Sequence, residues 1–268
     1  MMENLYGLIG EKLGHTYSPQ IHNKILEETH TNGYYGLFQV KKENLKYAVS
    51  GLKALGYNGV NVTIPYKLDI IKYLDSLSPE ASKIGAINVV NIDKNGMAIG
   101  YNTDYYGFGM MLNHANVKID GETAVILGTG GASKAVTQYL KDNGIKDIII
   151  VSRNVKLAKR KYPDDKIIMY DELNEVSNCS VIINCTPVGM FPKIEFSPIN
   201  KKYLTNFNTA IDLIYNPTNT LFLKNAKENG LRTVNGLYML IAQAVKSQEI
   251  WNNTKISNNV INNILDIF

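Results

Sequence analysis

The sequence predicts a two-lobed α/β protein, and three observations indicate this architecture. Over roughly the first hundred residues, apolar strand-like runs alternate with amphipathic helical stretches, a pattern typical of a mainly parallel sheet covered by helices. Residues 85–104 differ, because two strand-like pieces flank the turn sequence DKNG and predict a hairpin. A second alternating series begins at residue 123. We therefore expect domains over 1–102 and 103–235, with C-terminal helices over 236–268 returning to the first domain.

The elements of the first lobe follow from hydrophobic periodicity. LYGLIG (residues 5–10) and YYGLFQV (34–40) are short apolar runs that predict strands. A helical pattern begins at about Pro19, and a second covers ENLKYAVSGLKALG, residues 43–56. These elements predict two βα units in succession.

The stretch GVNVTIPYKLDI, residues 59–70, predicts a strand that stops at a proline. Its apolar residues alternate with polar ones, so we expect a core face and a polar face. The core face would carry Val60, Val62 and Ile64, and the polar face Asn61 and Thr63. Pro65 has no N–H for the ladder, so the strand should end near Ile64.

Lys67 follows this strand at an unusual position. Leu68, Ile70, Ile71 and Leu74 predict a short helix with Lys67 in its first turn. A helix N-terminus disfavours a cation by about 0.3–1 kcal/mol. Lys67 is therefore either an exposed side chain that tolerates this cost or a group used in acid–base chemistry.

Composition bounds the class of protein. The chain has 268 residues, is 45% hydrophobic and 19% charged, and carries a formal charge of +4, which together indicate a globular protein without a strong electrostatic reason to bind nucleic acid. Cys179 and Cys185 are the two cysteines, and neither they nor the four histidines show metal-ligand spacing. We find no signal sequence and no apolar run near the roughly 20 residues that cross a bilayer. We expect a cytoplasmic protein that binds neither membrane nor metal.

Residues 123–154 carry a dinucleotide-binding pattern. An apolar strand leads into a glycine-rich turn, a helix follows as far as a cap at Gly144, and a strand over 148–151 completes a βαβ unit. Ser133, a small residue, stands in the third glycine position. The turn glycines, which allow a pyrophosphate to approach the backbone and the helix N-terminus, are Gly128, Gly130 and Gly131.

The end of the second strand favours NADP over NAD. An NAD site usually carries an acidic residue here, whereas this chain has Ser152, Arg153 and Asn154. The Arg153 guanidinium suits a 2′-phosphate, and Lys156 adds a nearby cation. The alternative is that Arg153 is only a solvated residue at a strand end. NADP would indicate hydride transfer.

Two polar segments allow both structural and functional interpretations. Ser18 before Pro19 can be a helix N-cap, but Thr16 and Ser18 also offer two hydroxyls for a carboxylate near a helix N-terminus. Asp104 can cap the helix that follows it or act chemically. His15 and His22, near the same loop, are interpreted as structural or as residues that support the site without contacting the substrate.

Eight motifs, taken in order and over almost the entire chain, resemble the shikimate dehydrogenase family. They are GHTYSPQIHN, GVNVTIPYK, GAINV, NTDYYG, GTGGAS, NCTPVGM, DLIYNPTNTLFL and NGLYMLIAQA. The resemblance implies an enzyme that reversibly reduces 3-dehydroshikimate to shikimate with NADPH, on the route to chorismate and the aromatic amino acids. It also implies a Rossmann-type NADP-binding domain and a discontinuous α/β substrate-binding domain, in a monomer or homodimer.

The resemblance also implies roles for individual residues. It implies a catalytic pair, Lys67 and Asp104. Substrate-binding residues would be Thr16 and Ser18 for the carboxylate, Thr63, Lys67, Asn88, Asp104 and Gln243 for the ring hydroxyls, and Tyr215 lining the same cleft. Cofactor-binding residues would be Gly128, Thr129, Gly130, Gly131, Ala132, Ser152, Arg153, Asn154 and Lys156, with Thr186, Leu213, Gly236 and Met239 nearer the nicotinamide.

Two positions depart from the family pattern. Thr16 stands where serine is usual, and Leu157 stands where many NADP-using members carry a second arginine, which puts the strength of the NADP preference in doubt. The alternatives are a quinate/shikimate dehydrogenase with broader substrate or cofactor range, and a non-catalytic sensor of the same fold. A folate-linked NADP dehydrogenase is less consistent with the paired hydroxyls of Thr16 and Ser18.

Overall fold

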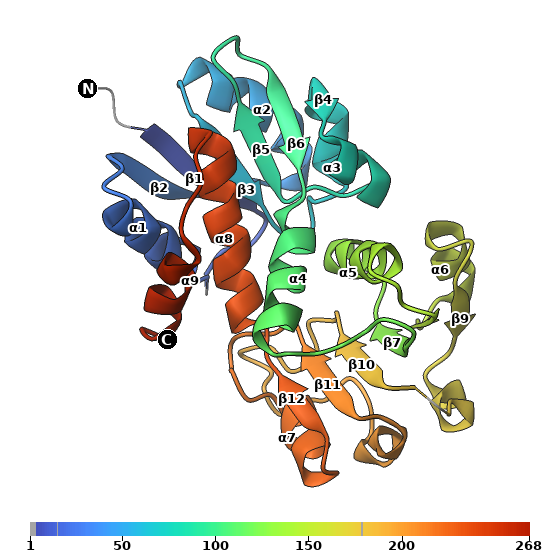
Figure 1. Ribbon diagram of the computed structural model, residues 1–268. Coiled ribbons are helices and arrows are strands. Elements are labelled where there is room, and N and C mark those ends of the chain that lie inside the picture. Colours follow the sequence, from blue (N-terminus) through green and yellow to red (C-terminus); the bar gives the residue numbers. More distant parts are fainter. Residues whose placement is uncertain (1–3, 15, 178) are drawn as a thin grey trace. The chain divides into compact units, whose positions relative to one another are not determined.

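The computed structural model describes residues 4–14, 16–177 and 179–268, so His15 lies outside the described residues. The chain forms two compact units. The first unit combines Met1–Gly107 with Ile241–Phe268, and the second is Phe108–Leu240 (Figure 1). The chain passes from one unit to the other inside two helices, α4 (Thr103–His114) and α8 (Leu237–Asn252). Each unit contains its own six-stranded sheet.

The sheet of the first unit is mixed, in the order β2-β1-β3-β5-β6-β4. Its strands are β1 (Asn4–Gly10), β2 (Gly33–Gln39), β3 (Gly59–Val62), β4 (Ser76–Leu77), β5 (Val89–Ile92) and β6 (Ala98–Tyr101). Strands β1, β2 and β3 are parallel, and β5 runs antiparallel to both β3 and β6. The predicted hairpin over 85–104 is therefore confirmed. It also makes β3 and β6 point in the same direction.

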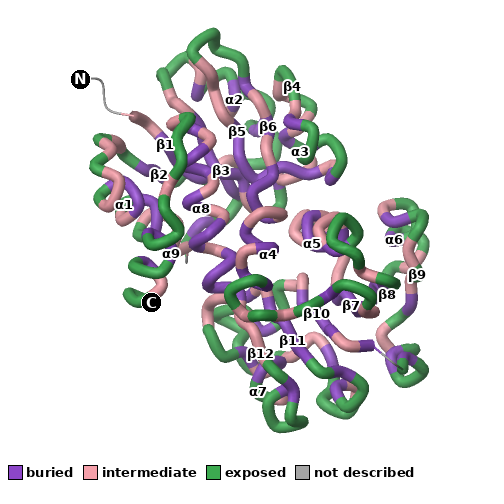
Figure 2. The backbone as a smooth tube through the Cα atoms, in the orientation of Figure 1, coloured by how far each residue is buried: buried purple, intermediate pink, exposed green. Residues whose placement is uncertain are grey.

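Helices cover both faces of this sheet. They are α1 (Ser18–Glu28), α2 (Leu45–Ala54), α3 (Pro79–Ile84), part of α8, and α9 (Asn258–Leu265). One core cluster contains Val60 and Val62 with the apolar side of α2, and another contains Tyr6, Tyr35 and Trp251 of α8. All four residues of β3 are buried (Figure 2).

The expectation of a polar face on β3 is wrong. Asn61 is only 5% exposed, because the face that carries it is also covered, and Ile64, expected in the core, is 65% exposed. The strand ends at Val62, two residues earlier than predicted. A sequence window of this length contains no sign of the second covering layer, part of which comes from the C-terminal end of the chain.

The predicted short helix is present as a 3₁₀ helix, but the placement of Lys67 in its first turn is wrong. Residues 64–68 form turns, and a 3₁₀ helix then covers Asp69–Tyr73, so Lys67 precedes the helix. Leu68, Ile71 and Leu74 are spaced by three residues, which is the period of a 3₁₀ helix. The helix dipole therefore does not account for Lys67.

The second unit is a parallel sheet in the order β12-β11-β10-β7-β8-β9. Its strands are β7 (Thr123–Leu127), β8 (Asp147–Val151), β9 (Lys166–Ile168), β10 (Val181–Asn184), β11 (Thr209–Asp212) and β12 (Arg232–Val234). Its helices are α5 (Gly131–Asp142), α6 (Val155–Lys161) and α7 (Leu221–Glu228). The predicted βαβ unit over 123–154 is confirmed as β7, α5 and β8.

The strand order reverses beside β7, because the chain continues outward through β8 and β9 on one side and through β10, β11 and β12 on the other. In open α/β sheets, ligands bind outside the carboxyl ends of the strands at such a reversal. The glycine-rich turn lies at this point, directly after β7. Within the described part of the chain, no helix is both long and apolar enough to cross a membrane.

Candidate active site

The polar segments predicted to bind substrate lie together at one end of the strands of the first sheet, which is called here the substrate edge. Strands β1, β3 and β6 finish at this edge, and β5 begins there because it runs in the opposite direction. The segments that contain Thr16 and Ser18, Thr63 and Lys67, and Asp104 follow β1, β3 and β6, and Asn88 directly precedes β5. Side chains far apart in the sequence are thereby brought to one place.

Lys67 and Asp104 form an ion pair at this edge. The Lys67 Nζ donates to Oδ2 of Asp104 across 2.5 Å, and the two side chains are only 15% and 8% exposed. Asp104 lies in the first turn of α4. The backbone N–H of Tyr105 in this turn donates to Oδ1 of Asn102 at 3.3 Å, so Asn102 supplies the capping bond. Asp104 is thus paired with an ammonium, and the interpretation of Asp104 as a simple helix cap is wrong.

Asn88 fixes the other oxygen of Asp104. Its Nδ2 group lies 3.0 Å from Oδ1 of Asp104, 3.0 Å from Oγ1 of Thr103 and 3.3 Å from Oε1 of Gln243. Its own Oδ1 accepts from the backbone N–H of Thr103 at 2.7 Å. The Asp104 carboxylate is therefore held on both sides, by an amide and by an ammonium. The structure brings four predicted residues together here: Lys67, Asn88, Asp104 and Gln243.

The hydroxyls of Thr16 and Ser18 lie against one another at the start of α1. Thr16 Oγ1 donates to Ser18 Oγ at 2.9 Å and accepts from the backbone N–H of Ser18 at 3.2 Å. The predicted N-cap at Ser18 is wrong, because α1 already begins at Ser18 and its N-cap, Tyr17, makes no capping side-chain bond. Two hydroxyls beside a helix N-terminus form an arrangement that can receive a carboxylate.

Two further residues are predicted to bind substrate: Thr63 in the first unit and Tyr215 in the second. Thr63 is half-buried directly after β3, where its N–H donates to the carbonyl of Ile9 at 2.9 Å. Tyr215 is half-buried in the segment between β11 and α7 of the second unit.

The glycine-rich turn of the second unit has room for a pyrophosphate. Gly128 has φ of +99°, and a Cβ there would lie 2.8 Å from Cγ2 of Thr186. A Cβ built on Gly130 would meet nothing within 4 Å, so this side of the turn is open. Gly130 caps α5 without a side-chain bond, which leaves the first amides of Gly131 and Ala132 available to an anion. These residues fit a dinucleotide.

Two side chains stabilise this turn by hydrogen bonds that the sequence did not predict: Ser133, noted above only as a small residue, and Lys161. Ser133 is fully buried, and its hydroxyl donates to the carbonyl of Gly128 at 2.9 Å and contacts the hydroxyl of Tyr162 at 2.8 Å. Lys161 at the end of α6 donates to the carbonyl of Thr129 at 3.1 Å. Burial raises the pKa of Tyr162, so its hydroxyl stays protonated and available as a donor.

The end of β8 combines structural and exposed polar residues. Asn154 caps α6, because its Oδ1 accepts from the N–H of Leu157 at 2.9 Å, and Ser152 Oγ accepts from the N–H of Asn154 at 3.2 Å. Arg153 and Lys156 are exposed, and Leu157 is 45% exposed. The cations at this strand end are therefore accessible to an anionic group.

A buried carboxylate organises the ends of β10 and β11. Asp212 is fully buried and accepts from Asn184 Nδ2 at 3.0 Å, from the N–H of Ile214 at 3.1 Å and from the Thr220 hydroxyl at 2.6 Å. Burial raises the pKa of Asp212 to about 6, although these donors act in the opposite direction. Asn184 in turn accepts from the Thr186 hydroxyl at 2.7 Å. Asp212 thus positions the segment that carries Thr186.

The last two predicted cofactor residues lie at the start of α8 and just before it. Gly236 packs against the backbone of Leu213 so closely that a Cβ would collide with the Leu213 carbonyl oxygen. Met239 is buried at 6% exposure in the first turn of α8. Glycine is required at position 236 by this backbone contact alone.

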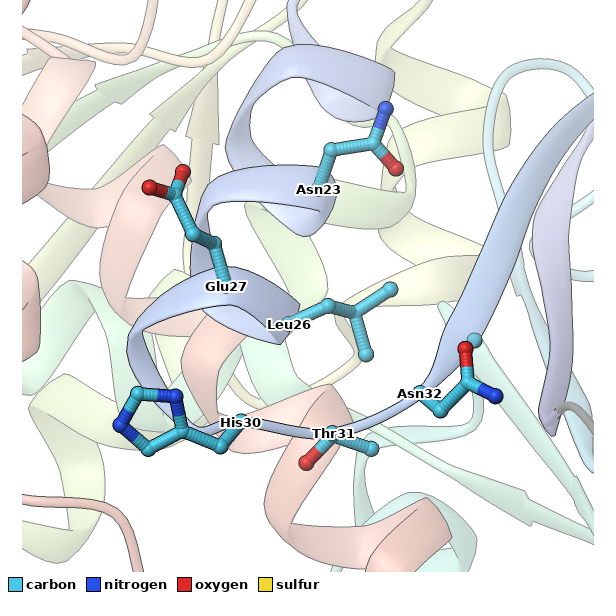
Figure 3. A pocket seen from close by; sticks show the side chains of 7 residues that line it. Asn23, Leu26, Glu27, His30, Thr31 and Asn32 are labelled. Atoms are coloured by element: carbon cyan, nitrogen blue, oxygen red, sulfur yellow. The ribbon is translucent and has the colours of Figure 1, made fainter. Parts of the chain in front are cut away.

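A hollow elsewhere in the first unit contains none of the predicted residues. It has a volume of about 480 Å³ and lies at the C-terminal end of α1, whereas Ser18 begins that helix (Figure 3). Its lining residues are Asn23, Leu26, Glu27, His30, Thr31, Asn32 and Gly33. The side chains of Glu27, His30 and Asn32 point in different directions and do not converge on one point. In the described ranges, no group of three or more His, Cys, Asp or Glu residues is placed to hold a metal ion.

The comparisons with known proteins agree with this geometry. Residues 8–90 match the family model of the shikimate dehydrogenase substrate binding domain. The chain is 48% identical over 254 residues to a shikimate dehydrogenase (NADP(+)) of Clostridium perfringens, a match that covers 94% of this chain and 93% of that protein.

Solved structures extend the likeness to the whole chain. A chorismate mutase/shikimate 5-dehydrogenase fusion protein from Clostridium acetobutylicum matches with a TM-score of 0.96 and 48% identity, covering 100% of this chain and 97% of that one. Shikimate 5-dehydrogenase from Thermus thermophilus, in complex with NADP(H) and shikimate, matches with a TM-score of 0.86 and 28% identity, covering 96% and 97% of the two chains.

Proposed function

This chain belongs to the shikimate dehydrogenase family, and from that premise we propose that it catalyses the reversible reduction of 3-dehydroshikimate to shikimate with NADPH. The observation that carries the proposal is the Lys67–Asp104 pair, whose side chains are 15% and 8% exposed and whose carboxylate is held by Asn88. The reaction needs a positioned proton donor and acceptor beside a polyhydroxylated ring, and this cluster supplies both. The cofactor is NADP.

We assign the two ends of the substrate to two groups of side chains. The carboxylate would accept from the hydroxyls of Thr16 and Ser18, which already contact each other at the start of α1. The ring hydroxyls would be bound by Thr63, Lys67, Asn88, Asp104 and Gln243, and Tyr215 is assigned to the same substrate. A carboxylate and neighbouring hydroxyls thus each have partners of matching chemistry.

Lys67 is proposed as the acid–base residue. In the reduction, negative charge develops on the carbonyl oxygen, and the Lys67 ammonium stabilises this charge and then donates its proton to the oxygen. NADPH, when bound, supplies the hydride to the carbonyl carbon. In the oxidation of shikimate, Lys67 accepts the hydroxyl proton. Asp104 holds the Lys67 amine in place through the 2.5 Å contact and accepts from a neighbouring substrate hydroxyl.

The residues for NADP divide into a pyrophosphate group and a 2′-phosphate group. The open side of Gly130 and the first amides of α5 would receive the pyrophosphate. Arg153, with Lys156, would contact the 2′-phosphate, because a guanidinium binds phosphate through paired hydrogen bonds. Thr186, Leu213, Gly236 and Met239 would lie toward the nicotinamide.

The direct test is consumption of NADPH in the presence of 3-dehydroshikimate, with NADH as comparator. We expect rapid oxidation of NADPH and a much slower reaction with NADH. Because Leu157 stands in place of a second cation, a quinate/shikimate dehydrogenase with broader cofactor range is the second candidate. Comparable rates with NADH, or oxidation of quinate as fast as that of shikimate, would favour this second candidate. No turnover with either cofactor would contradict both.

We also propose that the protein acts in the cytoplasm, as a monomer or homodimer. The chain has only two cysteines, Cys179 and Cys185, and a low cysteine content is usual in a protein of a reducing compartment. Light scattering of the purified protein would measure its oligomeric state.

A further inference from the structure

A lysine at the end of α6 places its ammonium group on the glycine-rich turn of the second unit. The Nζ of Lys161 donates to the backbone carbonyl of Thr129 at 3.1 Å, and Thr129 lies between Gly128 and Gly130 of that turn. An ammonium has three N–H donors, so this bond leaves two of them for other acceptors. Among the described residues, Lys161 is in no ion pair, so no acidic side chain there neutralises its charge.

The glycine-rich turn lies beside the segment that follows β8. Strands β7 and β8 are parallel neighbours, and Leu127 stands opposite Val151 at their carboxyl ends. Thr129 and Arg153 each come two residues after this pair, so the chain leaves the sheet at two adjacent places. The Lys161 ammonium, fixed at Thr129, and Arg153 therefore belong to neighbouring segments at the same end of the sheet.

The geometry of α6 directs the Lys161 side chain back toward the start of that helix. Residues four apart lie on one face of an α-helix, so Lys161 shares a face with Leu157, which is 45% exposed. Helical side chains tilt toward the N-terminus, so the long side chain at 161 covers the turn that contains Leu157. This helix begins directly after Asn154, at the end of β8. Lys161 thus adds a cation to a face on which Leu157 carries no charge.

The charges around the turn favour an anion. Residues 152–163, with the sequence SRNVKLAKRKYP, contain no acidic residue. Near the start of α5, burial and, after it, the positive charge of Lys161 lower the pKa of Lys134. Two cations that act on one another in this way are both stabilised when an anion binds near them.

We propose that Lys161 determines the specificity for NADP(H): its ammonium keeps the bond to Thr129 and donates a second N–H to the 2′-phosphate, alongside Arg153. The 2′-phosphate is favoured over the pyrophosphate because Arg153 and α6 both follow β8, whereas the pyrophosphate is assigned to the first amides of α5. A hydrogen bond between an ammonium and a phosphate is stronger than one between neutral groups. This inference rests on the proposed function, which assigns the 2′-phosphate to the end of β8.

The chain offers two matched controls for Lys161→Met. Lys159 is an exposed lysine of the same helix, and residues two apart do not share a face, so Lys159→Met removes the same charge from another face. Ser133→Ala removes the hydroxyl that donates to the carbonyl of Gly128 at 2.9 Å. This second control measures the effect of a loosened turn without the loss of a charge.

The experiment is calorimetric titration of wild type and these variants with NADP⁺, NAD⁺ and adenosine 2′,5′-bisphosphate, which has the 2′-phosphate but no pyrophosphate. K161M should weaken binding of NADP⁺ and of the bisphosphate by about tenfold and that of NAD⁺ by less than about twofold. K159M should leave all three affinities within about twofold of wild type. S133A should weaken NADP⁺ and NAD⁺ by equal factors. Equal losses for NADP⁺ and NAD⁺ in K161M, or unchanged binding of the bisphosphate, would overturn the proposal.

Three further variants complete the test. K161R keeps a charged donor and should bind the bisphosphate within about threefold of wild type, and K161Q should reproduce the K161M pattern if K161M does not fold. R153A separates the two failures. If R153A loses the preference for NADP⁺ and the uncharged Lys161 variants keep it, this inference fails and the proposed function stands. If wild type binds NADP⁺ no more tightly than NAD⁺, the proposed 2′-phosphate site itself is contradicted.

Discussion

Lys67 and Asp104 meet at 2.5 Å although 37 residues separate them in the chain. Their contact follows from the direction of two strands, because β3 and β6 both end at the edge where β5 begins. Asn88 stands at the start of β5, between them, and its amide donates to Asp104. The geometry of the pair is therefore set by the register of three strands and not by a flexible loop alone.

Lys67→Ala should lower kcat by about 10²–10⁴-fold with a smaller change in the KM for shikimate, because a positioned acid–base group contributes about this much to proton transfer. Steady-state kinetics in the direction of shikimate oxidation measure both constants. Lys72→Ala, which removes an exposed lysine from the following 3₁₀ helix, is the control. Near-normal turnover of the Lys67 variant would contradict the assigned role.

Asp104→Asn should damage turnover and substrate affinity together. The amide leaves the Lys67 ammonium without its counter-charge and replaces an acceptor of substrate hydroxyl with a weaker one, so we expect KM to rise by about tenfold or more while kcat falls. Asp69→Asn changes an exposed acid in the same unit and should leave both constants unchanged. A variant with altered KM alone would show that Asp104 binds substrate without orienting Lys67.

Substitutions at the end of β8 should change the choice of cofactor. Arg153→Ala should weaken NADP⁺ binding by about tenfold or more and change NAD⁺ binding little, because only NADP⁺ carries the 2′-phosphate. Leu157→Arg should strengthen the preference for NADP⁺. Calorimetric titration with both dinucleotides measures this, with Arg160→Ala, at an exposed position of α6, as the control. Equal losses for both dinucleotides in the Arg153 variant would contradict the assignment.

His22 should make the stability of the fold depend on pH. Burial lowers the pKa of His22 to about 3, so the native state keeps it neutral where the unfolded chain, with a pKa near 6.5, takes up a proton. The contribution of His22 to stability is present above pH ~6.5 and is lost as pH falls toward 3.

Urea denaturation between pH 7 and pH 4 measures this effect. For His22→Phe, the free energy of unfolding should fall less steeply with decreasing pH than in wild type, by a slope difference of up to about 1.4 kcal/mol per pH unit. Parallel slopes for the two proteins would show that His22 is already charged in the native state or remains accessible to solvent.

The architecture was predictable because short stretches of the sequence carry the signals for its strands, turns and helices. The glycine turn after β7, the helix that follows it and the DKNG hairpin each have a short-range signature, and the structure contains all three. Lys67 and Asn61 were placed wrongly for two different reasons. The apolar spacing after Pro65 suits a 3₁₀ helix as well as an α-helix, and the layer that buries Asn61 includes Ser247, 186 residues further along the chain.

The site was less predictable than the fold. Taken singly, Thr16, Ser18, Lys67 and Asp104 each had an adequate structural interpretation, and only the resemblance to a family joined them. Their convergence depends on strand register, which no single window contains. Thr103 lies inside the motif NTDYYG but had no predicted role, and Ser247 and Tyr35 lie in no motif. Asn61 was interpreted as part of a polar face, so the sequence contained no sign of the buried side chains that it contacts.

The Asn61–Ser247 hydrogen bond has a consequence for how this protein can change over time. Asn61 also accepts from the buried Tyr35 hydroxyl, so apolar groups at 61 and 247 alone would leave that hydroxyl without its partner, which costs about 1–3 kcal/mol, whereas replacing all three with apolar groups of similar shape can be nearly neutral. Positions 35, 61 and 247 should therefore change together. A library randomised at all three should recover joint replacements far more often than single ones, and an ancestor that lost one would have been under pressure to lose the others.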